Sequence, residues 1–250
     1  MEPYYYQTLS KAEQSSYQAM QAGLQAFAPS FPVPLLENRA LTDVFMKLRL
    51  DCPQLFYAGT FQYRYYPDSR NAELIPAYLF EKGKLKEHQK ALQARVEKLV
   101  RPVARCGDEE KLLYIHDFIC KNVRYDKLKK QYSHEIIGVL GHGVGVCEGI
   151  AKAVKILCDA LQIQCIIALA ENNPEKGMKY RHAWNVVRLD KKYYHLDCTF
   201  DLSLGNPEEI RYDYFRLSDK QIFRDHERLV WRVPACEDAD RFYYKKKKLS

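Results

Sequence analysis

Three residues of this chain, met in the order Cys147, His182 and Asp197, have the side chains that acyl transfer requires. A cysteine thiolate attacks an amide carbonyl, a histidine takes the thiol proton and returns it to the leaving group, and an aspartate fixes the histidine tautomer. Each of these residues alone is more often structural. The prediction of a catalytic triad therefore depends on the segments that carry them.

The segment around Cys147 combines a glycine-rich approach with the start of a helix. Glycines alternate with other residues over 141–145, and apolar residues at helical spacing follow over 150–161. Glycine lets the backbone approach closely. A helix N-terminus supplies N–H groups and partial positive charge, which favour a thiolate and can hold an oxyanion. We predict Cys147 as the nucleophile at the start of a buried helix.

A hairpin around Asp190-Lys191 is expected to bring His182 and Asp197 together. If Leu189 pairs with Lys192, His182 and Asp197 become diagonal neighbours on one face of the sheet. Such neighbours lie about 7–8 Å apart, within reach of an imidazole and a carboxylate. A slip of one residue would move Asp197 to the other face, so the register decides whether the pair forms. Glycine would suit the second turn position better than Lys191.

Six further residues are candidates to contact a substrate or to support the triad. They are Trp184, Gly145, Glu148, His142, His195 and Tyr180. His142 is the alternative general base, but it has no evident carboxylate to orient it. His195 shares the predicted face of Asp197 and either lines the site or packs. Trp184 lies beside His182 on that face, where it shields the triad from water or belongs to the core.

The cysteines favour neither a metal site nor disulfides. Zinc held by Cys147, His182 and Cys198 is the alternative to a triad, but no close ligand pair is present to nucleate it, so we expect no metal and no cofactor. None of the eight cysteines forms a C-x-x-C pair. We expect scattered reduced thiols, most of them buried.

The elements that position these residues are predicted from apolar periodicity and breakers. Helices are expected over 4–27, 38–51, 86–101 and from Asp108, as N-cap, to Cys120, and strands over 61–65, 75–80 and 163–170. Residues 1–100 are predicted as a helix-rich cap or accessory region, 101–235 as a catalytic core and 236–250 as a basic tail.

Composition limits the classes of partner. Apolar residues make up 47% of the 250 residues, which suffices for a sizeable core, and the net charge is +7. The run Lys245–Lys248 is most simply a solvated tail. A nucleic-acid binder using this tail is the alternative, without a supporting motif, so we expect no nucleic acid. We expect no membrane contact and a cytoplasmic location, because neither a signal sequence nor a run of about 20 apolar residues is visible.

The motifs resemble those of the transglutaminase-like superfamily, in particular its bacterial members. The matching segments are Gly145-Val146-Cys147-Glu148-Gly149-Ile150-Ala151, His182-Ala183-Trp184-Asn185-Val186, Asp197-Cys198-Thr199-Phe200-Asp201 and residues 115–126. The resemblance implies an α+β, papain-like core with the nucleophile at the N-terminus of a central helix packed on an antiparallel sheet. Glu148 departs from the Gln common in bacterial relatives, and Phe200 from the usual Trp.

The residues and the resemblance together predict a cysteine enzyme that attacks peptide or side-chain amides of a protein or peptide substrate through a thioester. We favour hydrolysis, as by a peptidase or amidase, because water is always present and no acceptor-lysine site is visible. A protein cross-linking transglutaminase is one alternative. A non-catalytic binding module that retains the triad is the other. The sequence does not predict an oligomeric state.

Overall fold

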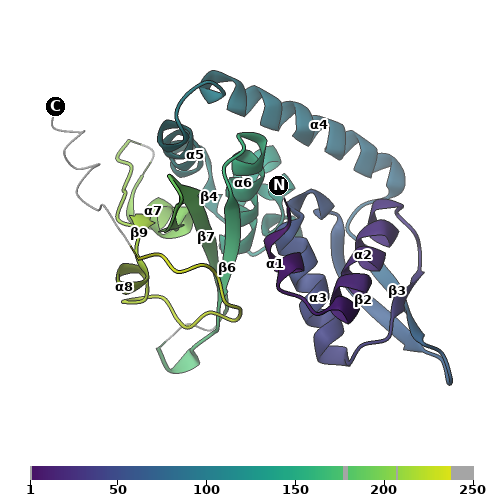
Figure 1. The fold of residues 1–250 in the computed structure, drawn as a ribbon. Helices are drawn as coiled ribbons and strands as arrows, with labels where there is room; N and C mark the ends of the chain where they lie inside the picture. Colours follow the sequence, from purple (N-terminus) through teal and green to yellow (C-terminus); the bar gives the residue numbers. More distant parts are fainter. Residues whose placement is uncertain (1, 177–179, 207, 238–250) are drawn as a thin grey trace. The chain divides into compact units, whose positions relative to one another are not determined.

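The computed structural model describes residues 2–176, 180–206 and 208–237 (Figure 1). They form two compact units, Glu2–Ala91 and a second that begins at Leu92. Helix α4 (Lys82–Val100) runs through this division. The predicted basic tail lies, from residue 238 onward, outside the described residues. Within the described ranges, no helix has both the length and the apolar character needed to cross a membrane.

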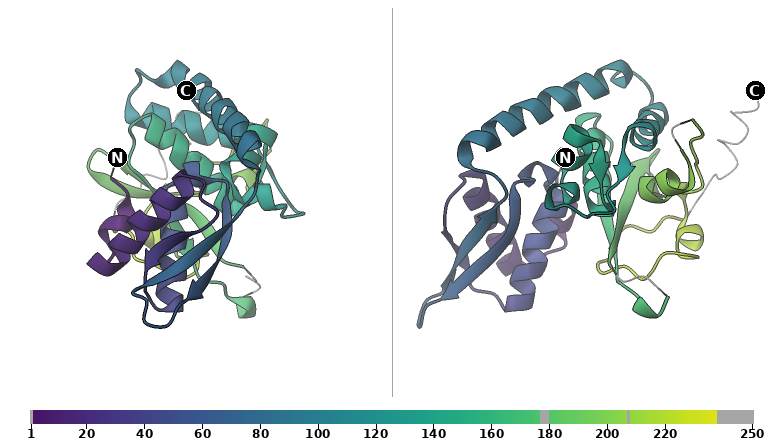
Figure 2. Two further views of the ribbon diagram at one scale, coloured as in Figure 1. Left: turned by 90° about the vertical axis from the view of Figure 1, so that its right-hand side faces the viewer. Right: turned by 180° about the vertical axis from the view of Figure 1, so that it is seen from behind.

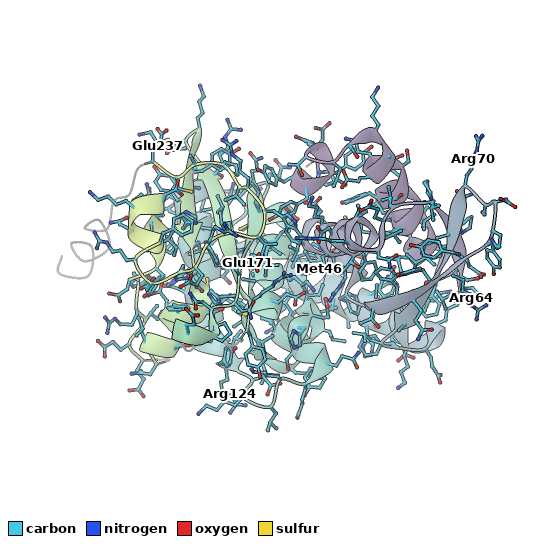
Figure 3. All side chains as sticks on the ribbon, turned by 90° about the horizontal axis from the view of Figure 1, so that it is seen from below. Met46, Arg64, Arg70, Arg124, Glu171 and Glu237 are labelled. Atoms are coloured by element: carbon cyan, nitrogen blue, oxygen red, sulfur yellow. The ribbon has the colours of Figure 1, made fainter. Side chains whose placement is uncertain are left out.

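The N-terminal unit is built from three helices and a three-stranded sheet. The helices are α1 (Tyr4–Gln7), α2 (Lys11–Gln25) and α3 (Asn38–Asp51). The antiparallel sheet has the order β1 (Phe31–Pro34), β3 (Asn71–Tyr78), β2 (Ala58–Tyr65). Arg64 and Arg70 lie at the exposed end of the β2–β3 hairpin (Figure 3). The predicted helix over 38–51 and the two predicted strands of this unit are confirmed.

The single helix predicted over 4–27 is wrong, because the chain breaks at Ser10. The Ser10 hydroxyl accepts from the Glu13 N–H (3.4 Å), and the Ser10 N–H donates to the Glu13 carboxylate (2.8 Å). This reciprocal capping box begins a new helix at Lys11.

The predicted N-cap of the helix that begins at Asp108 is also wrong, because Asp108 is not its N-cap. Gly107 takes that position, and its N–H donates to the Glu110 carboxylate (3.3 Å).

The second unit combines helices with a four-stranded antiparallel sheet. The sheet has the order β6 (Cys165–Ala170), β7 (His182–Leu189), β8 (Lys192–Leu196), β9 (Phe215–Leu217). The helices that follow α4 are α5 (Asp108–Asn122), α6 (Cys147–Ala160), α7 (Cys198–Leu204) and α8 (Asp219–Ile222). Helix α6 packs against β6 and β7, and α5 packs against α6 and α7 (Figure 2). The predicted α+β class with antiparallel sheets is confirmed.

The connection from α5 to α6 is made of short elements. It contains β4 (Arg124–Tyr125), a 3₁₀ turn (Gln131–His134), a π-helical turn (Ile137–Gly141) and β5 (Val144–Gly145). β4 and β5 pair in parallel, with Tyr125 opposite Gly145. This pairing fixes the path of the chain immediately before α6. Further 3₁₀ turns lie at Pro53–Leu55, Arg101–Val103 and Pro174–Lys176.

All strand β6 side chains are buried, as are most of those on β7. Asn185 on β7 donates to the Ala151 carbonyl of α6 (2.9 Å), which ties the helix to the sheet. Cys120, Cys158 and Cys165 are buried as predicted, and all eight cysteines are free. The core of this unit therefore lies between α6 and the β6–β7 pair.

Candidate active site

Cys147 is the first residue of α6 and is partly exposed. The preceding Val146 is extended, with φ −93° and ψ 174°. Gly143 has φ +65°, a left-handed conformation that glycine adopts without strain. A Cβ on Gly145 would lie 2.6 Å from Val139 Cγ2, so only glycine fits without movement there. The predicted glycine-rich approach therefore has a steric basis.

The hairpin forms in the predicted register. Leu189 pairs with Lys192 across the turn. Asp190 and Lys191 have φ of 47° and 68°, as a two-residue turn of the right twist requires. His182 Nε2 lies 2.6 Å from Asp197 Oδ2, a short charge-assisted hydrogen bond. The predicted approach of these two side chains is thus confirmed.

The charge on His182 is favoured by its neighbours. Burial disfavours the imidazolium, but Asp197, with a smaller contribution from Cys147, outweighs burial and raises the pKa of His182 to about 10. Burial also opposes ionisation of Asp197, yet His182 and His226 hold the pKa of Asp197 well below its usual range. His182 is therefore an imidazolium at neutral pH, hydrogen-bonded to the Asp197 carboxylate.

The carboxylate of Asp197 is saturated with donors. It is the N-cap of α7, where Oδ1 accepts from the N–H groups of Thr199 (2.8 Å) and Phe200 (3.1 Å). Oδ2 accepts from His182 and also from His226 Nε2, 2.9 Å away. Four hydrogen bonds leave the fully buried carboxylate little freedom to rotate. Its orientation toward His182 is consequently fixed.

Trp184 and His195 lie behind His182. The Trp184 and His182 rings are stacked, with centroids 5.8 Å apart. Trp184 Nε1 donates to His195 Nδ1 (2.9 Å), and His195 Nε2 lies 2.8 Å from Asp219 Oδ1. An indole N–H only donates, so His195 Nδ1 accepts and its proton is on Nε2. The indole N–H is therefore engaged inside the protein, and Trp184 presents a ring face to His182.

The other sequence candidates point elsewhere. Glu148 pairs with Lys152 (2.7 Å) and with His134 (3.5 Å). His142 is exposed and packs its ring near Tyr132. Tyr180 is 67% exposed, with Lys129 Nζ 3.3 Å from its ring centroid. The structure thus brings together His182, Asp197 and Trp184, with His195 behind them, and Cys147 contributes to the raised pKa of His182.

Two residues near the site were not identified from the sequence. Burial raises the pKa of the half-exposed Tyr125, and Cys147, Asp126 and Asp197 raise it further. The pairing of β4 with β5 places Tyr125 opposite Gly145, two residues before Cys147. His226 is buried and contacts Asp197, 29 positions earlier. It lies outside any helix or strand, so no periodicity could reveal it.

Two groups place potential ligand atoms within 4.8 Å of one another in the described ranges. They are His182, Asp197 and His226, and His195, Asp219 and Cys236. Hydrogen bonds account for both groups, because each histidine Nε2 directs its proton at a carboxylate. A protonated ring nitrogen offers no lone pair to a metal. The zinc set considered from the sequence, which needs Cys198, is neither of these groups.

Comparison with known families identifies the second unit. Residues 90–198 match the family model of the transglutaminase-like superfamily. The matched region includes Cys147, His182 and Asp197. This part of the chain therefore matches the transglutaminase-like superfamily, the resemblance that the sequence motifs predicted. Among curated proteins, no match was found.

Three solved structures show low similarity to this chain. A transglutaminase (TGase) is 10% identical, with a TM-score of 0.39 over 57% of this chain and 44% of its own. A candidate cysteine protease from Cytophaga hutchinsonii is 15% identical, with a TM-score of 0.34 over 56% and 61%. A candidate protease from Parabacteroides distasonis is 15% identical, with a TM-score of 0.34 over 56% and 36%. The chain thus covers less than two thirds of each.

Proposed function

We propose that this protein is a cysteine enzyme that cleaves amide bonds of protein or peptide substrates, with Cys147 as nucleophile, His182 as general base and acid, and Asp197 as the orienting carboxylate. One observation carries the proposal: His182 is hydrogen-bonded to Asp197 at 2.6 Å, and Cys147, the first residue of α6, contributes to the raised pKa of His182. One imidazole thus connects a fixed carboxylate to a thiol at a helix start.

Acylation follows from this geometry. The His182 imidazolium holds the proton of Cys147, and the Cys147 thiolate attacks the amide carbonyl carbon. The tetrahedral oxyanion collapses, the C–N bond breaks, and His182 returns the proton to the departing amine. A thioester to Cys147 remains.

The start of α6 supplies a donor for the oxyanion. The Ile150 N–H makes the first intrahelical bond, to the Val146 carbonyl (2.9 Å). The Cys147 N–H precedes that bond and points out of the helix end. We assign it to the oxyanion, where the positive end of the helix dipole also favours negative charge.

Deacylation by water is the proposed outcome. His182, now neutral, takes a proton from water, and the hydroxide attacks the thioester carbonyl carbon. The carboxylic acid then leaves, with Cys147 again a thiolate and His182 again an imidazolium. An amine in place of water would give a cross-link by the same steps. Water is present at far higher concentration, which favours the hydrolytic route.

A product assay separates these outcomes. An unfolded protein such as reduced casein is incubated with the enzyme, with and without a labelled primary amine, and the products are read by mass spectrometry. Cleavage or side-chain deamidation should appear without amine and disappear in Cys147→Ser and His182→Ala. Cys106→Ser, which alters the other partly exposed cysteine, should behave as the wild type. Products that appear only with amine would replace hydrolysis by cross-linking.

A further inference from the structure

A second histidine shares the carboxylate oxygen that holds His182. His226 Nε2 lies 2.9 Å from Asp197 Oδ2, and His226 Nδ1 lies 2.7 Å from Asp225 Oδ1. The His226 side chain is 1% exposed, as is that of Asp197, whereas that of Asp225 is 47% exposed. The imidazole therefore bridges a buried carboxylate and a half-exposed one.

These two contacts determine the proton count of His226. A carboxylate oxygen only accepts, so each ring nitrogen must donate for both contacts to be hydrogen bonds. An imidazole that donates from both nitrogens carries a positive charge. The bridge therefore requires an imidazolium, and a neutral ring would leave one nitrogen lone pair facing a carboxylate.

The surroundings of His226 also suit a cation. Its ring centroid lies 4.6 Å from that of Phe200, 4.9 Å from Trp184 and 5.6 Å from Tyr214. Aromatic faces attract cations more strongly where water is excluded. The Tyr214 hydroxyl also donates to Asp225, which keeps that carboxylate in place.

The other titratable groups around His226 are histidines. The His182 ring on β7 lies 5.2 Å away, centroid to centroid. Burial lowers the pKa of His195 on β8, Asp219 opposes this effect, and His226 adds a smaller lowering. The Nε2 atoms of His182 and His226 thus face the same Asp197 oxygen. Each reduces the share of negative charge available to the other.

We propose that His226 is a positioning residue, an imidazolium clamped between Asp197 and Asp225 that fixes the Asp197 carboxylate and limits how strongly it holds the charge of His182. This role rests on the proposed function, since it acts on the catalytic histidine through the aspartate. His226 touches neither the thiol nor the substrate in this scheme.

Nuclear magnetic resonance of protein labelled with ¹⁵N-histidine tests the charge directly. Both ring nitrogens of His226 should carry protons in the folded protein at neutral pH, since both face carboxylates. Its signals are assigned by their loss in His226→Gln. A neutral ring, with one unprotonated nitrogen, would overturn the proposal.

The effect on His182 is read in the same spectra. Removing a neighbouring cation in His226→Gln should shift the loss of the His182 proton upward by about one pH unit. If His226 only packs against Asp197, its loss should loosen the His182–Asp197 bond and leave the His182 midpoint unchanged or lower. Either of these results would overturn the proposal. Asp225→Asn alters only the half-exposed partner and should give a smaller shift in the same direction, so a His226 variant that fails to fold does not prevent the test.

Alkylation of Cys147 separates this proposal from the proposed function. If wild-type Cys147 is no more reactive than Cys106, the proposed enzyme activity fails whatever the spectra show. If Cys147 is selectively reactive but His226→Gln leaves the His182 midpoint unchanged, only the role of His226 fails.

Discussion

At the scale of single residues, the Asp197 carboxylate organises the candidate site. It accepts four hydrogen bonds, two from the start of α7 and two from histidines. It can serve His182 in this way only as an anion. An amide at this position would present an N–H to one of these donors.

The substitution Asp197→Asn should therefore be severe. The amide favours the wrong His182 tautomer, and turnover should fall by a factor on the order of 10⁴, as for orienting carboxylates of other triads. The measurement is the rate of amide hydrolysis. Asp219→Asn is the matched control, because Asp219 also lies against a histidine Nε2, at 2.8 Å, but behind Trp184. Equal losses in both variants would contradict the assignment of Asp197.

The three candidate residues could be found from the sequence because each lies in a segment with a local signal. Cys147 follows alternating glycines, and His182 and Asp197 flank a hairpin whose register can be counted. His226 has no such signal, because irregular chain carries no periodicity that relates it to a strand. Only the folded path of the residues after α8 brings it to Asp197.

At the scale of elements, the β7–β8 turn controls the site. Its register places His182 and Asp197 together, although Asp190 and Lys191 both adopt positive φ. Non-glycine residues pay a steric cost in that region. The sequence predicted this register correctly. It predicted the helix starts less well, because the N–H groups of Ser10 and Gly107 are capped by glutamate side chains three residues later in the chain.

Lys191→Gly should consequently stabilise the protein. Glycine relieves the left-handed strain at φ 68°, and the free energy of unfolding should rise by about 0.5–1 kcal/mol. Urea unfolding measures this change. Lys191→Ala retains a Cβ and serves as the control, with no gain expected. A loss of stability in the glycine variant would show that the Lys191 side chain contributes more than the turn strain costs.

At the scale of the whole molecule, the charged pair of His182 and Asp197 couples stability to pH. The folded pKa of His182, about 10, lies above its ordinary value, so its contribution is fully present below about pH 6.5. That contribution is lost as pH rises toward 10. The pKa of Asp197 is lowered, so at acid pH the same interaction is lost as the carboxylate is protonated, when pH falls below about 4.

The free energy of unfolding should therefore decline between about pH 6.5 and 10, and less steeply in His182→Gln. Urea titrations of both proteins at a series of pH values give the two slopes. The pKa shifts of His182 and Asp197 report the same interaction, so its contribution to the free energy of unfolding is counted once. Parallel pH dependences in wild type and variant would contradict the raised pKa of His182.

The α+β class could be predicted from the periodicity of buried helices and strands. The family resemblance could be predicted from the three motifs around Cys147, His182 and Asp197 and their order in the chain. The boundary between the two units was harder to predict from the sequence. The structure changes from one unit to the other at Leu92, inside α4, whereas the break at Pro102 suggested residue 100. A continuous helix that serves two units leaves no breaker at the boundary.

The most direct test of the central claim is the pH dependence of iodoacetamide labelling, read for each cysteine by mass spectrometry. Cys106 provides an internal standard, because it and Cys147 are the two partly exposed thiols. Cys147 should label faster than Cys106 at and below neutral pH, and His182→Ala should remove that advantage without affecting Cys106. Equal labelling of the two thiols, or an advantage of Cys147 that survives in His182→Ala, would contradict an active thiol paired with His182.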